Sequence, residues 1–270
     1  MRIFEIKNEF LKSKTVGWLL YFDAGKRFYI ELPEKSDPWE TPILLSSFLK
    51  KGWHSIDSEW SEMWVRERII PPDRQNLGQI LRDNHMKAYD EFRMLLLTQG
   101  RCSQDDCYLS ETAIDKIPEW LARRFSRKVK DVIPQSDHHM LVFFMNGETK
   151  QCALNEILSK DIAFSPVLEN NALYLSVSIQ PGGYGICWGR DLNVPDSKLY
   201  AVGKKVPLSY EDFIYFAKHK IVNTPETMER LGCTRQNVND LVKRNRLNPI
   251  KVTGKNKMFL IHDVMELQER

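Results

Sequence analysis

The feature that most constrains the fold is a tight turn between two helical patterns, Leu231-Gly232-Cys233-Thr234. Before it, Asn223-Thr224-Pro225-Glu226 combines a polar cap, an early proline and an acid in the first turn, which together start a helix. Gly232 ends that helix because glycine adopts left-handed dihedrals without a Cβ penalty. Thr234 then caps a second helix, so the sequence predicts a helix-turn-helix. The apolar residues at the spacing of an inner helical face are Val238, Leu241 and Val242.

The outer face of the second helix is rich in amide and basic side chains. Amides and guanidinium groups recognise base edges in the major groove of DNA, and lysines neutralise phosphates. The pattern therefore predicts a DNA-recognition helix. The residues expected to contact DNA from this helix are Thr234, Arg235, Gln236, Asn237, Asn239, Lys243 and Arg244.

A β-hairpin is expected after the recognition helix. Two β-rich segments, residues 250–252 and 258–261, flank the turn segment Thr253-Gly254-Lys255-Asn256. Such a hairpin forms a wing whose lysines reach an adjacent phosphate or the minor groove. A short helix is expected over residues 262–269. The wing residues expected to contact DNA are Lys251, Lys255, Asn256 and Lys257.

The charge of the chain supports a polyanionic partner for this end alone. The formal net charge of the whole protein is only +3. Between Arg230 and Lys257, however, eight residues are basic and one, Asp240, is acidic. A run of charge can also be a solvated surface, and the alternative for this region is a small helical domain for protein contacts.

The whole C-terminal stretch resembles the excisionase-type and MerR-type helix-turn-helix domains. Those domains share an L-G-[small apolar]-[ST] turn, a valine in the recognition helix and a last helix that begins D-[VL]. Here these elements are Leu231 to Thr234, Val238, and Asp263-Val264. Two positions depart from the family: Met228 stands where alanine is usual, and Asn245 where glycine is usual. The resemblance implies DNA binding and a wider spacing of the two helices.

The first two hundred residues contain an internal repeat. Residues 19–32 align without gaps on residues 141–154, and each segment predicts a strand, a glycine-containing turn and a second strand. Further on, Trp64-x-Arg66 and Trp188-x-Arg190 are each followed by Pro-Asp at a similar offset. A duplicated hairpin unit is expected, although two hairpins can also be similar by chance.

Residues 130–203 resemble a small bacterial α+β domain family of unknown function. The residues that carry the resemblance are the hairpin that ends in Asn146-Gly147 and the tail from Trp188 through Asp191 and Pro195-Asp196 to Leu199-Tyr200. Gly189 follows Trp188 more closely than is usual in that family. Members sometimes carry a helix-turn-helix after this tail. The resemblance implies architecture and no catalytic residue.

These observations predict an α+β fold in four parts. The parts are an α+β unit with the first hairpin (1–75), a helical connector (76–129), an α+β unit with the second hairpin (130–203), and a winged helix-turn-helix domain (204–270). One helix is expected over residues 76–99 and another over 114–125. Lys204-Lys205-Val206-Pro207 is expected to be a linker, and Ser209 to cap a helix with Phe213 and Phe216.

The remaining sequence predicts no catalytic residue, metal site or cofactor. Cys102 and Cys107 lack a second ligand pair with zinc-finger spacing. The glycines of residues 181–185 lack the Lys-Ser/Thr ending of a phosphate-binding loop and suggest a turn. Asp105-Asp106 suits a loop cap better than a metal. Trp53, Trp60 and Trp64 suit either a base-stacking platform or core packing.

The expected function is therefore sequence-specific binding of double-stranded DNA, as a transcriptional regulator, for example a repressor, of a bacterium or a mobile element. A homodimer is expected because one recognition helix spans only a few base pairs. Two alternatives are a phage or plasmid counter-defence inhibitor of the anti-CRISPR kind, which binds a protein through residues 1–200, and an excisionase-like DNA-bending factor. Five irregularly spaced cysteines, the charged N-terminal residues and the lack of a long apolar run favour the cytoplasm and no membrane contact.

Overall fold

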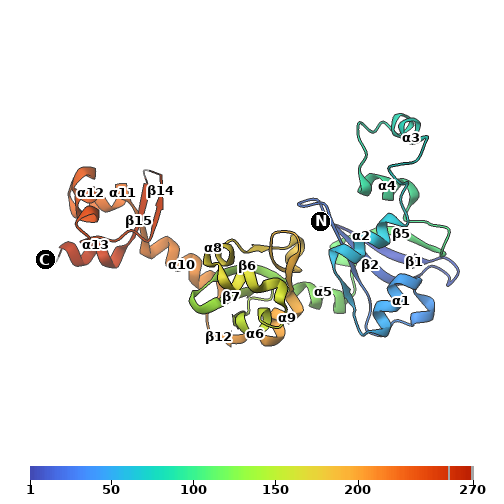
Figure 1. The fold of residues 1–270 in the computed structure, drawn as a ribbon, viewed down its shortest axis with the longest axis horizontal. Helices are drawn as coiled ribbons and strands as arrows, with labels where there is room; N and C mark the ends of the chain where they lie inside the picture. Colours follow the sequence, from blue (N-terminus) through green and yellow to red (C-terminus); the bar gives the residue numbers. More distant parts are fainter. Residues whose placement is uncertain (255, 269–270) are drawn as a thin grey trace. The chain divides into compact units, whose positions relative to one another are not determined.

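The protein has an α+β fold with antiparallel sheets in two compact units (Figure 1). The computed structural model describes residues 1–254 and 256–268. The larger unit contains residues 1–146 and 150–205, and the smaller unit contains residues 147–149 and the chain from Val206 on. Among the described residues, no helix has the length and apolar character needed to span a membrane.

A five-stranded sheet forms the first part of the larger unit, in the order β4-β3-β2-β1-β5. Strand β2 is buried along almost its whole length, which indicates a strand covered on both faces. Its alternate residues Leu19 and Tyr21 pack in one core, and Trp18 and Leu20 pack in another. The strands are β1 (Arg2–Asn8), β2 (Lys14–Phe22), β3 (Arg27–Glu31), β4 (Ser55–Ile56) and β5 (Cys107–Thr112).

Helices cover both faces of this sheet. Phe48, Trp64 and Phe92 from three helices fill the core on one face. Leu121 and Trp120 fill the other face together with Tyr184, which comes from the second part of the unit. The helices are η1 (Pro38–Glu40), α1 (Ile43–Lys50), α2 (Ser58–Arg66), α3 (Leu77–Asp83), α4 (Glu91–Thr98), η2 (Ile114–Lys116) and α5 (Glu119–Ser126).

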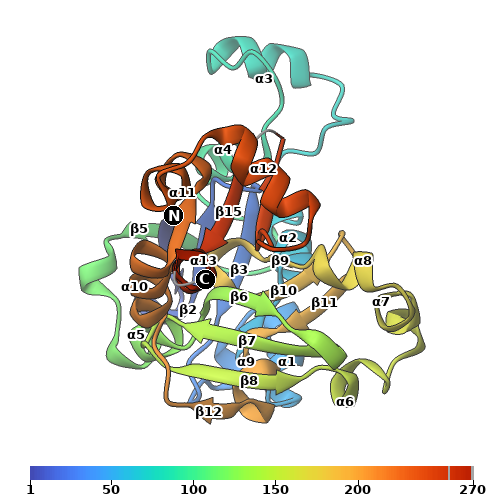
Figure 2. The same ribbon diagram turned by 90° about the vertical axis from the view of Figure 1, so that its left-hand side faces the viewer.

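Two smaller sheets form the second part of the larger unit. Figure 2 shows the strands of the first of these sheets in the order β6-β7-β8-β12. The second sheet has the order β11-β10-β9. The strands are β6 (Val129–Pro134), β7 (His139–Phe144), β8 (Thr149–Ala153), β9 (Ser178–Ile179), β10 (Gly185–Trp188), β11 (Leu192–Pro195) and β12 (Lys204–Val206). The helices are η3 (Ser136–His138), α6 (Asn155–Leu158), η4 (Ile162–Phe164), α7 (Ser165–Glu169), α8 (Asn171–Leu175), η5 (Pro181–Gly183) and α9 (Asp196–Val202).

Both predicted strand–turn–strand segments are present in the fold. The hairpin β2–β3 and the neighbouring strands β7–β8 stand at equivalent positions of the aligned segments, and β3 and β8 have the same length. Their turns contain Gly25 and Gly147, with φ of 86° and 83°, a region that favours glycine. In each case the preceding strand, β1 or β6, pairs with the first strand of the hairpin.

The predicted extension of the repeat to the tryptophan tails is wrong. Trp64 lies in helix α2, whereas Trp188 lies in strand β10. Asp57 caps α2 by accepting a hydrogen bond from the backbone N–H of Trp60, which starts a helix before Trp64 is reached. The two tails therefore differ in local structure.

Three expected elements differ in their bounds or their nature. The helix expected over residues 76–99 is two helices, α3 and α4, because Asn84 caps the first and His85 takes a left-handed φ of 53°. The helix expected over 114–125 is η2 followed by α5, with Pro118 as the N-cap of α5. The boundary between the two units falls within the expected linker at residues 204–207, but residues 204–206 are not irregular: they form β12 at the edge of a sheet.

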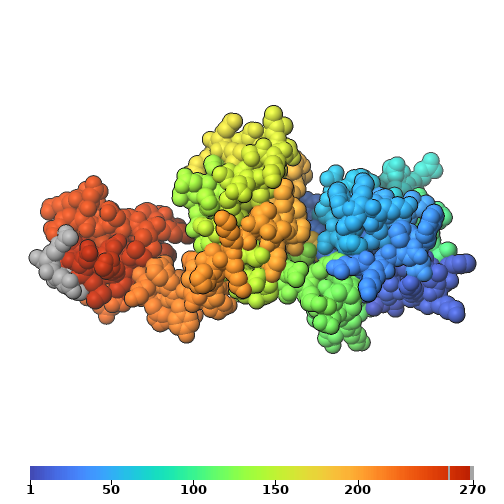
Figure 3. Space-filling view, turned by 90° about the horizontal axis from the view of Figure 1, so that it is seen from below, coloured from blue at the N-terminus to red at the C-terminus, as the bar shows by residue number. Residues whose placement is uncertain are grey.

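The smaller unit is built on a three-stranded sheet, in the order β13-β15-β14. In the space-filling view, its red-coloured segments pack as one body (Figure 3). The expected helix after Ser209 is present, with Ser209 and Asp212 forming a capping box. The elements are α10 (Tyr210–Lys220), β13 (Ile221–Asn223), α11 (Thr224–Leu231), α12 (Arg235–Lys243), β14 (Lys251–Thr253), β15 (Asn256–Leu260) and α13 (Ile261–Gln268).

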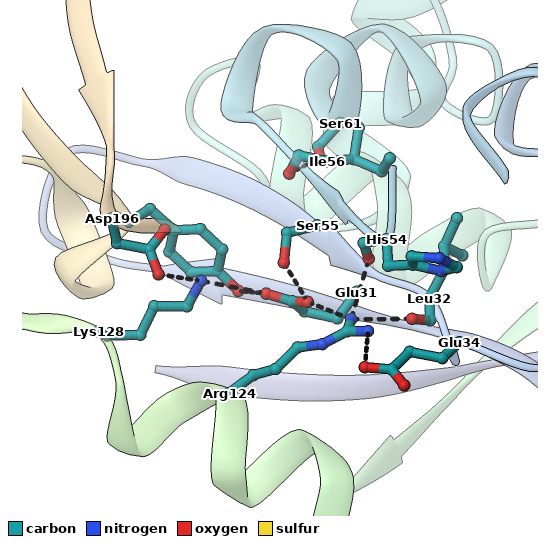
Figure 4. Close-up of polar contacts among 11 residues, drawn as sticks. Glu31, Leu32, Glu34, His54, Ser55, Ile56, Ser61, Arg124, Lys128 and Asp196 are labelled. Carbon is teal, nitrogen blue, oxygen red and sulfur yellow. Dashed lines mark hydrogen bonds and ion pairs between the residues drawn. The ribbon is translucent and has the colours of Figure 1, made fainter. Parts of the chain in front are cut away.

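A buried charge cluster connects the two parts of the larger unit. Glu31, at the end of β3, is fully buried and its carboxylate has four partners (Figure 4). Arg124 Nη1 and Ser55 Oγ donate to Oε2 at 2.9 and 2.6 Å. The Tyr184 hydroxyl donates to Oε1 at 2.8 Å, and Lys128 Nζ lies 3.3 Å from the same oxygen.

Lys128 extends the cluster to α9. Its ammonium lies 3.2 Å from Oδ2 of Asp196 and 3.5 Å from the centre of the Tyr184 ring. Burial raises the pKa of Asp196, and the neighbouring ammonium of Lys128 opposes that rise. Burial and the Glu31 carboxylate also raise the pKa of Tyr184, so its hydroxyl stays protonated and donates to Glu31. The buried acids Glu31 and Asp196 are thus balanced by the buried Lys128 and the half-buried Arg124.

The substitution Glu31→Gln should destabilise the larger unit because it leaves Arg124 and Lys128 without their shared carboxylate. We expect a loss of about 3–5 kcal/mol in the free energy of unfolding. Urea denaturation followed by tryptophan fluorescence measures this loss, since all seven tryptophans belong to the larger unit.

The matched control is Glu111→Gln, which breaks the exposed pair between Glu111 and Arg2. Exposed ion pairs contribute little, so its effect should stay within about 1 kcal/mol. Equal losses in the two variants would contradict the role assigned to Glu31.

Candidate nucleic-acid interface

The predicted helix-turn-helix is formed by α11 and α12. Asn223 caps α11 in a capping box with Glu226: Asn223 Oδ1 accepts from the Glu226 backbone N–H at 3.0 Å, and Glu226 Oε2 accepts from the Asn223 N–H at 2.8 Å. Gly232 ends the helix with a left-handed φ of 61°. Thr234 Oγ1 then accepts from the backbone N–H of Asn237 and starts α12.

A small apolar core fixes the rotation of α12 about its axis. Val238 is fully buried and belongs to a cluster with Phe259 of β15 and Val264 of α13. Leu241 and Val242 pack against this cluster and are partly buried. Because these three residues of α12 face inward, the helical period directs its polar residues outward.

Most of the predicted recognition residues of α12 lie on the surface. Gln236 and Lys243 lie nearly opposite Val238 on the helix. Asp240, which is not among the predicted contact residues, shares that face. Asp240 and Asn239 are half-buried. The predicted residues that the structure leaves exposed on or beside α12 are Thr234, Arg235, Gln236, Asn237, Lys243 and Arg244.

Asn239 and Lys257 are the predicted contact residues that the fold brings together. Lys257 Nζ of β15 donates to Oδ1 of Asn239 at 2.7 Å. The bond connects the wing to the recognition helix and occupies one lone pair of the Asn239 amide oxygen. The amide nitrogen of Asn239 carries the donors that a base acceptor would bind.

The wing separates its predicted contact residues onto two faces. Lys251 lies opposite Met258, and Val252 lies opposite Lys257. Since side chains alternate along a strand, Lys251 and Asn256 share the outer face, while Lys257 faces α12 with Phe259. Lys251 is therefore not beside Lys257. Lys255, predicted at the tip, lies outside the described residues.

Asn245, which stands where the similar helix-turn-helix domains usually have glycine, suits the backbone conformation at that position. Asn245 has a φ of 53°, in the left-handed region where asparagine is the best substitute for glycine. Its N–H donates to the carbonyl of Val242 at 3.0 Å, which closes the end of α12. Met228 is half-buried and packs against the core of this unit. The expected wider helix spacing stays a prediction.

Sequence reasoning missed the third strand of this unit and a residue that positions the wing. β13 pairs with β15, so the wing is the outer part of a three-stranded sheet. The residue that positions the wing is Thr224, which the sequence indicated only as part of a helix start. Thr224 is buried, and its hydroxyl donates to the backbone carbonyl of Lys257 and accepts from the backbone N–H of Lys257. The β-branched pair Ile221-Val222 just before the cap was the available sequence signal for β13.

The other residues that the sequence offered as candidates for chemistry have structural roles. Burial raises the pKa of Cys107 to about 12, so it is a thiol at neutral pH. Asp105 accepts from the Cys107 N–H and pairs with Arg68, as a loop cap does. Trp64 is fully buried, so it cannot join Trp53 in a base-stacking platform. Pro181 and its glycines form a turn before β10, as expected. In the described part of the chain, no three His, Cys, Asp or Glu side chains form a potential metal-binding group.

Comparison with known proteins gives one match. Residues 129–205, which form β6 to β12, match the family described as "Protein of unknown function (DUF2442)". This segment contains the second hairpin and Asp196 of the charge cluster. No curated protein and no solved structure matches the chain. The match covers less than a third of the chain and brings no activity to it.

The substitution Val238→Ala should weaken the smaller unit because Val238 anchors α12 to the core. Removing two buried methyl groups and leaving a cavity should cost about 2 kcal/mol, which corresponds to an increase of about 30-fold in the equilibrium constant for local opening of α12. Amide hydrogen exchange of residues 235–243, measured by mass spectrometry on the full chain, reports this loss.

The control is Val252→Ala, because Val252 is 56% exposed in the wing. It should change exchange in α12 by less than about 0.5 kcal/mol. If Val238→Ala left the protection of α12 unchanged, the anchoring role would be wrong.

Proposed function

We propose that the protein is a sequence-specific binder of double-stranded DNA and a transcriptional regulator of a bacterium or a bacterial mobile element. The observation that carries the proposal is the orientation of α12. Val238 faces the core, while Gln236, Lys243 and Arg244 are exposed to solvent. In DNA-binding helix-turn-helix proteins, the second helix inserts such a polar face into the major groove and contacts base edges there.

The two kinds of side chain have different expected roles. Lys243 and Arg244 close α12 with two adjacent positive charges, which suit the phosphates that flank the groove. Gln236 and Asn239 carry amides that pair with base edges. Lys251 and Asn256 on the outer face of the wing suit a neighbouring phosphate or the minor groove.

The proposal includes a homodimer that acts in the cytoplasm. One recognition helix contacts only a few base pairs, so a two-fold pair of helices on a palindromic site supplies the specificity of a regulator. All five cysteines are free, which suits a reducing compartment. The larger unit, with no activity brought by its family match, supplies the surface on which a partner protein would bind.

Selection from a randomised DNA pool should yield a defined site with two-fold symmetry. Its binding should weaken linearly with salt on a log–log plot. The double variant Lys243→Gln/Arg244→Gln removes two positive charges from each protomer and should reduce the slope for the dimer by about four. Fluorescence anisotropy over a salt series measures both quantities.

The matched control removes two exposed lysines of α10, as Lys218→Gln/Lys220→Gln. We expect it to leave the slope within experimental error. A wild-type chain that retains no DNA even at low salt would refute the proposal, and selected sites without symmetry would refute the dimer.

The substitution Gln236→Ala should reduce discrimination between bases more than it reduces general affinity. Losing one bidentate base contact costs about 1–3 kcal/mol of discrimination, or about 5- to 150-fold, at the contacted position alone. Competition between the selected site and its single-base variants measures this ratio.

Gln75→Ala, at an exposed glutamine of the larger unit, is the control and should preserve the discrimination. A uniform loss of affinity for every DNA sequence in Gln236→Ala would instead indicate a backbone contact.

A further inference from the structure

An apolar cavity lies between the two hairpin parts of the larger unit. Its volume is about 370 Å³, and apolar atoms form nearly all of its lining. Phe22 comes from the end of β2, Phe125 from the end of α5, and Tyr184 from the turn before β10. Ile114 and Met145 form its rim and are 56% and 54% exposed. The cavity thus uses residues from the first sheet, the connector and the second part.

Aromatic packing holds the wall of the cavity in place. Tyr184 stacks on Tyr29 with ring centres 3.8 Å apart, and Phe22 meets the edge of Tyr184 at 6.2 Å. Gly182 approaches Phe22 so closely that a Cβ would lie 2.2 Å from its ring. Its φ of 72° also favours glycine. A cavity with fixed aromatic walls is preformed, which is typical of small-molecule sites.

The charged side chain in the lining already has its partners. The ammonium of Lys128 lies 3.3 Å from Glu31, 3.2 Å from Asp196 and 3.5 Å from the centre of the Tyr184 ring. Its side chain is only 4% exposed. Lys128 therefore offers no free counter-charge to a ligand, and a charged ligand would lose hydration against the apolar atoms that form nearly all of the lining.

We propose that this cavity binds a neutral, apolar small molecule with one or two rings. The volume lies at the lower end of the range of about 300–1,000 Å³ that ligand sites occupy. A second copy of the chain fits less well, because a stable interface buries about 800 Å² on each partner. Among the described residues of the lining, only Met1, Ile114 and Met145 are large apolar side chains with strong exposure. This inference is independent of DNA binding.

The test titrates the full chain with N-phenyl-1-naphthylamine, a neutral probe whose fluorescence rises in apolar surroundings. We expect saturable binding of one probe per chain. Naphthalene and indole should displace it, whereas naphthalene-1-sulfonate at equal concentration should displace at least tenfold less. Absence of saturable binding, or equal displacement by the sulfonate, would overturn the proposal.

Two variants locate the site. Met145→Trp and Ile114→Trp place a large ring at the exposed rim and should each weaken probe binding at least tenfold. Met63→Trp is the matched control, because Met63 is 42% exposed on α2 and lies outside the lining. This variant should bind the probe with the affinity of the wild type. Thermal unfolding of each variant checks that the fold is kept.

Two results would overturn the location of the site. The first is wild-type affinity in both rim variants. The second is sedimentation of the wild-type chain as a dimer that Met145→Trp dissociates, because a second copy would then cover the cavity. An affinity loss confined to the two rim variants supports the proposal, whatever the outcome of the DNA experiments.

Discussion

The larger unit depends on one buried carboxylate. Glu31 ends a strand of the first sheet, yet three of its partners, Arg124, Lys128 and Tyr184, come from the connector and the second part. A buried charge is costly when it is unpaired, so the partners must come together for the fold to be stable. These contacts connect the second part to the first sheet.

That same arrangement creates the apolar cavity. Lys128 and Tyr184 belong to the cluster and also line the cavity. Because the cluster satisfies their polar groups, the surface that they turn toward the cavity behaves as apolar. The segment that matches a family of unknown function contributes Tyr184 and Asp196 to this arrangement. In the proposed apolar site, that segment supplies part of the wall and the preceding part supplies the rest.

The smaller unit differs from the larger one, because local sequence signals specify nearly all of its structure. The capping residues Asn223 and Thr234, the turn glycine Gly232 and the buried Val238 all have the roles expected from sequence. Each role depends on neighbours within a few residues, and short-range patterns record such roles well. The bond between Lys257 and Asn239 depends instead on pairing across the wing, which no local pattern contains.

The sequence by itself determined the α+β class, the hairpin repeat and the helix-turn-helix, because periodicity, caps and turn glycines act locally. It did not determine that Trp64 is helical, that residues 204–206 form an edge strand, or that β13 completes a sheet. The tertiary structure alone decided these features, and it alone brought Glu31, Lys128 and Asp196 together. Those residues are far apart in sequence, and only the balance of burial against charge pairing places them in one cluster.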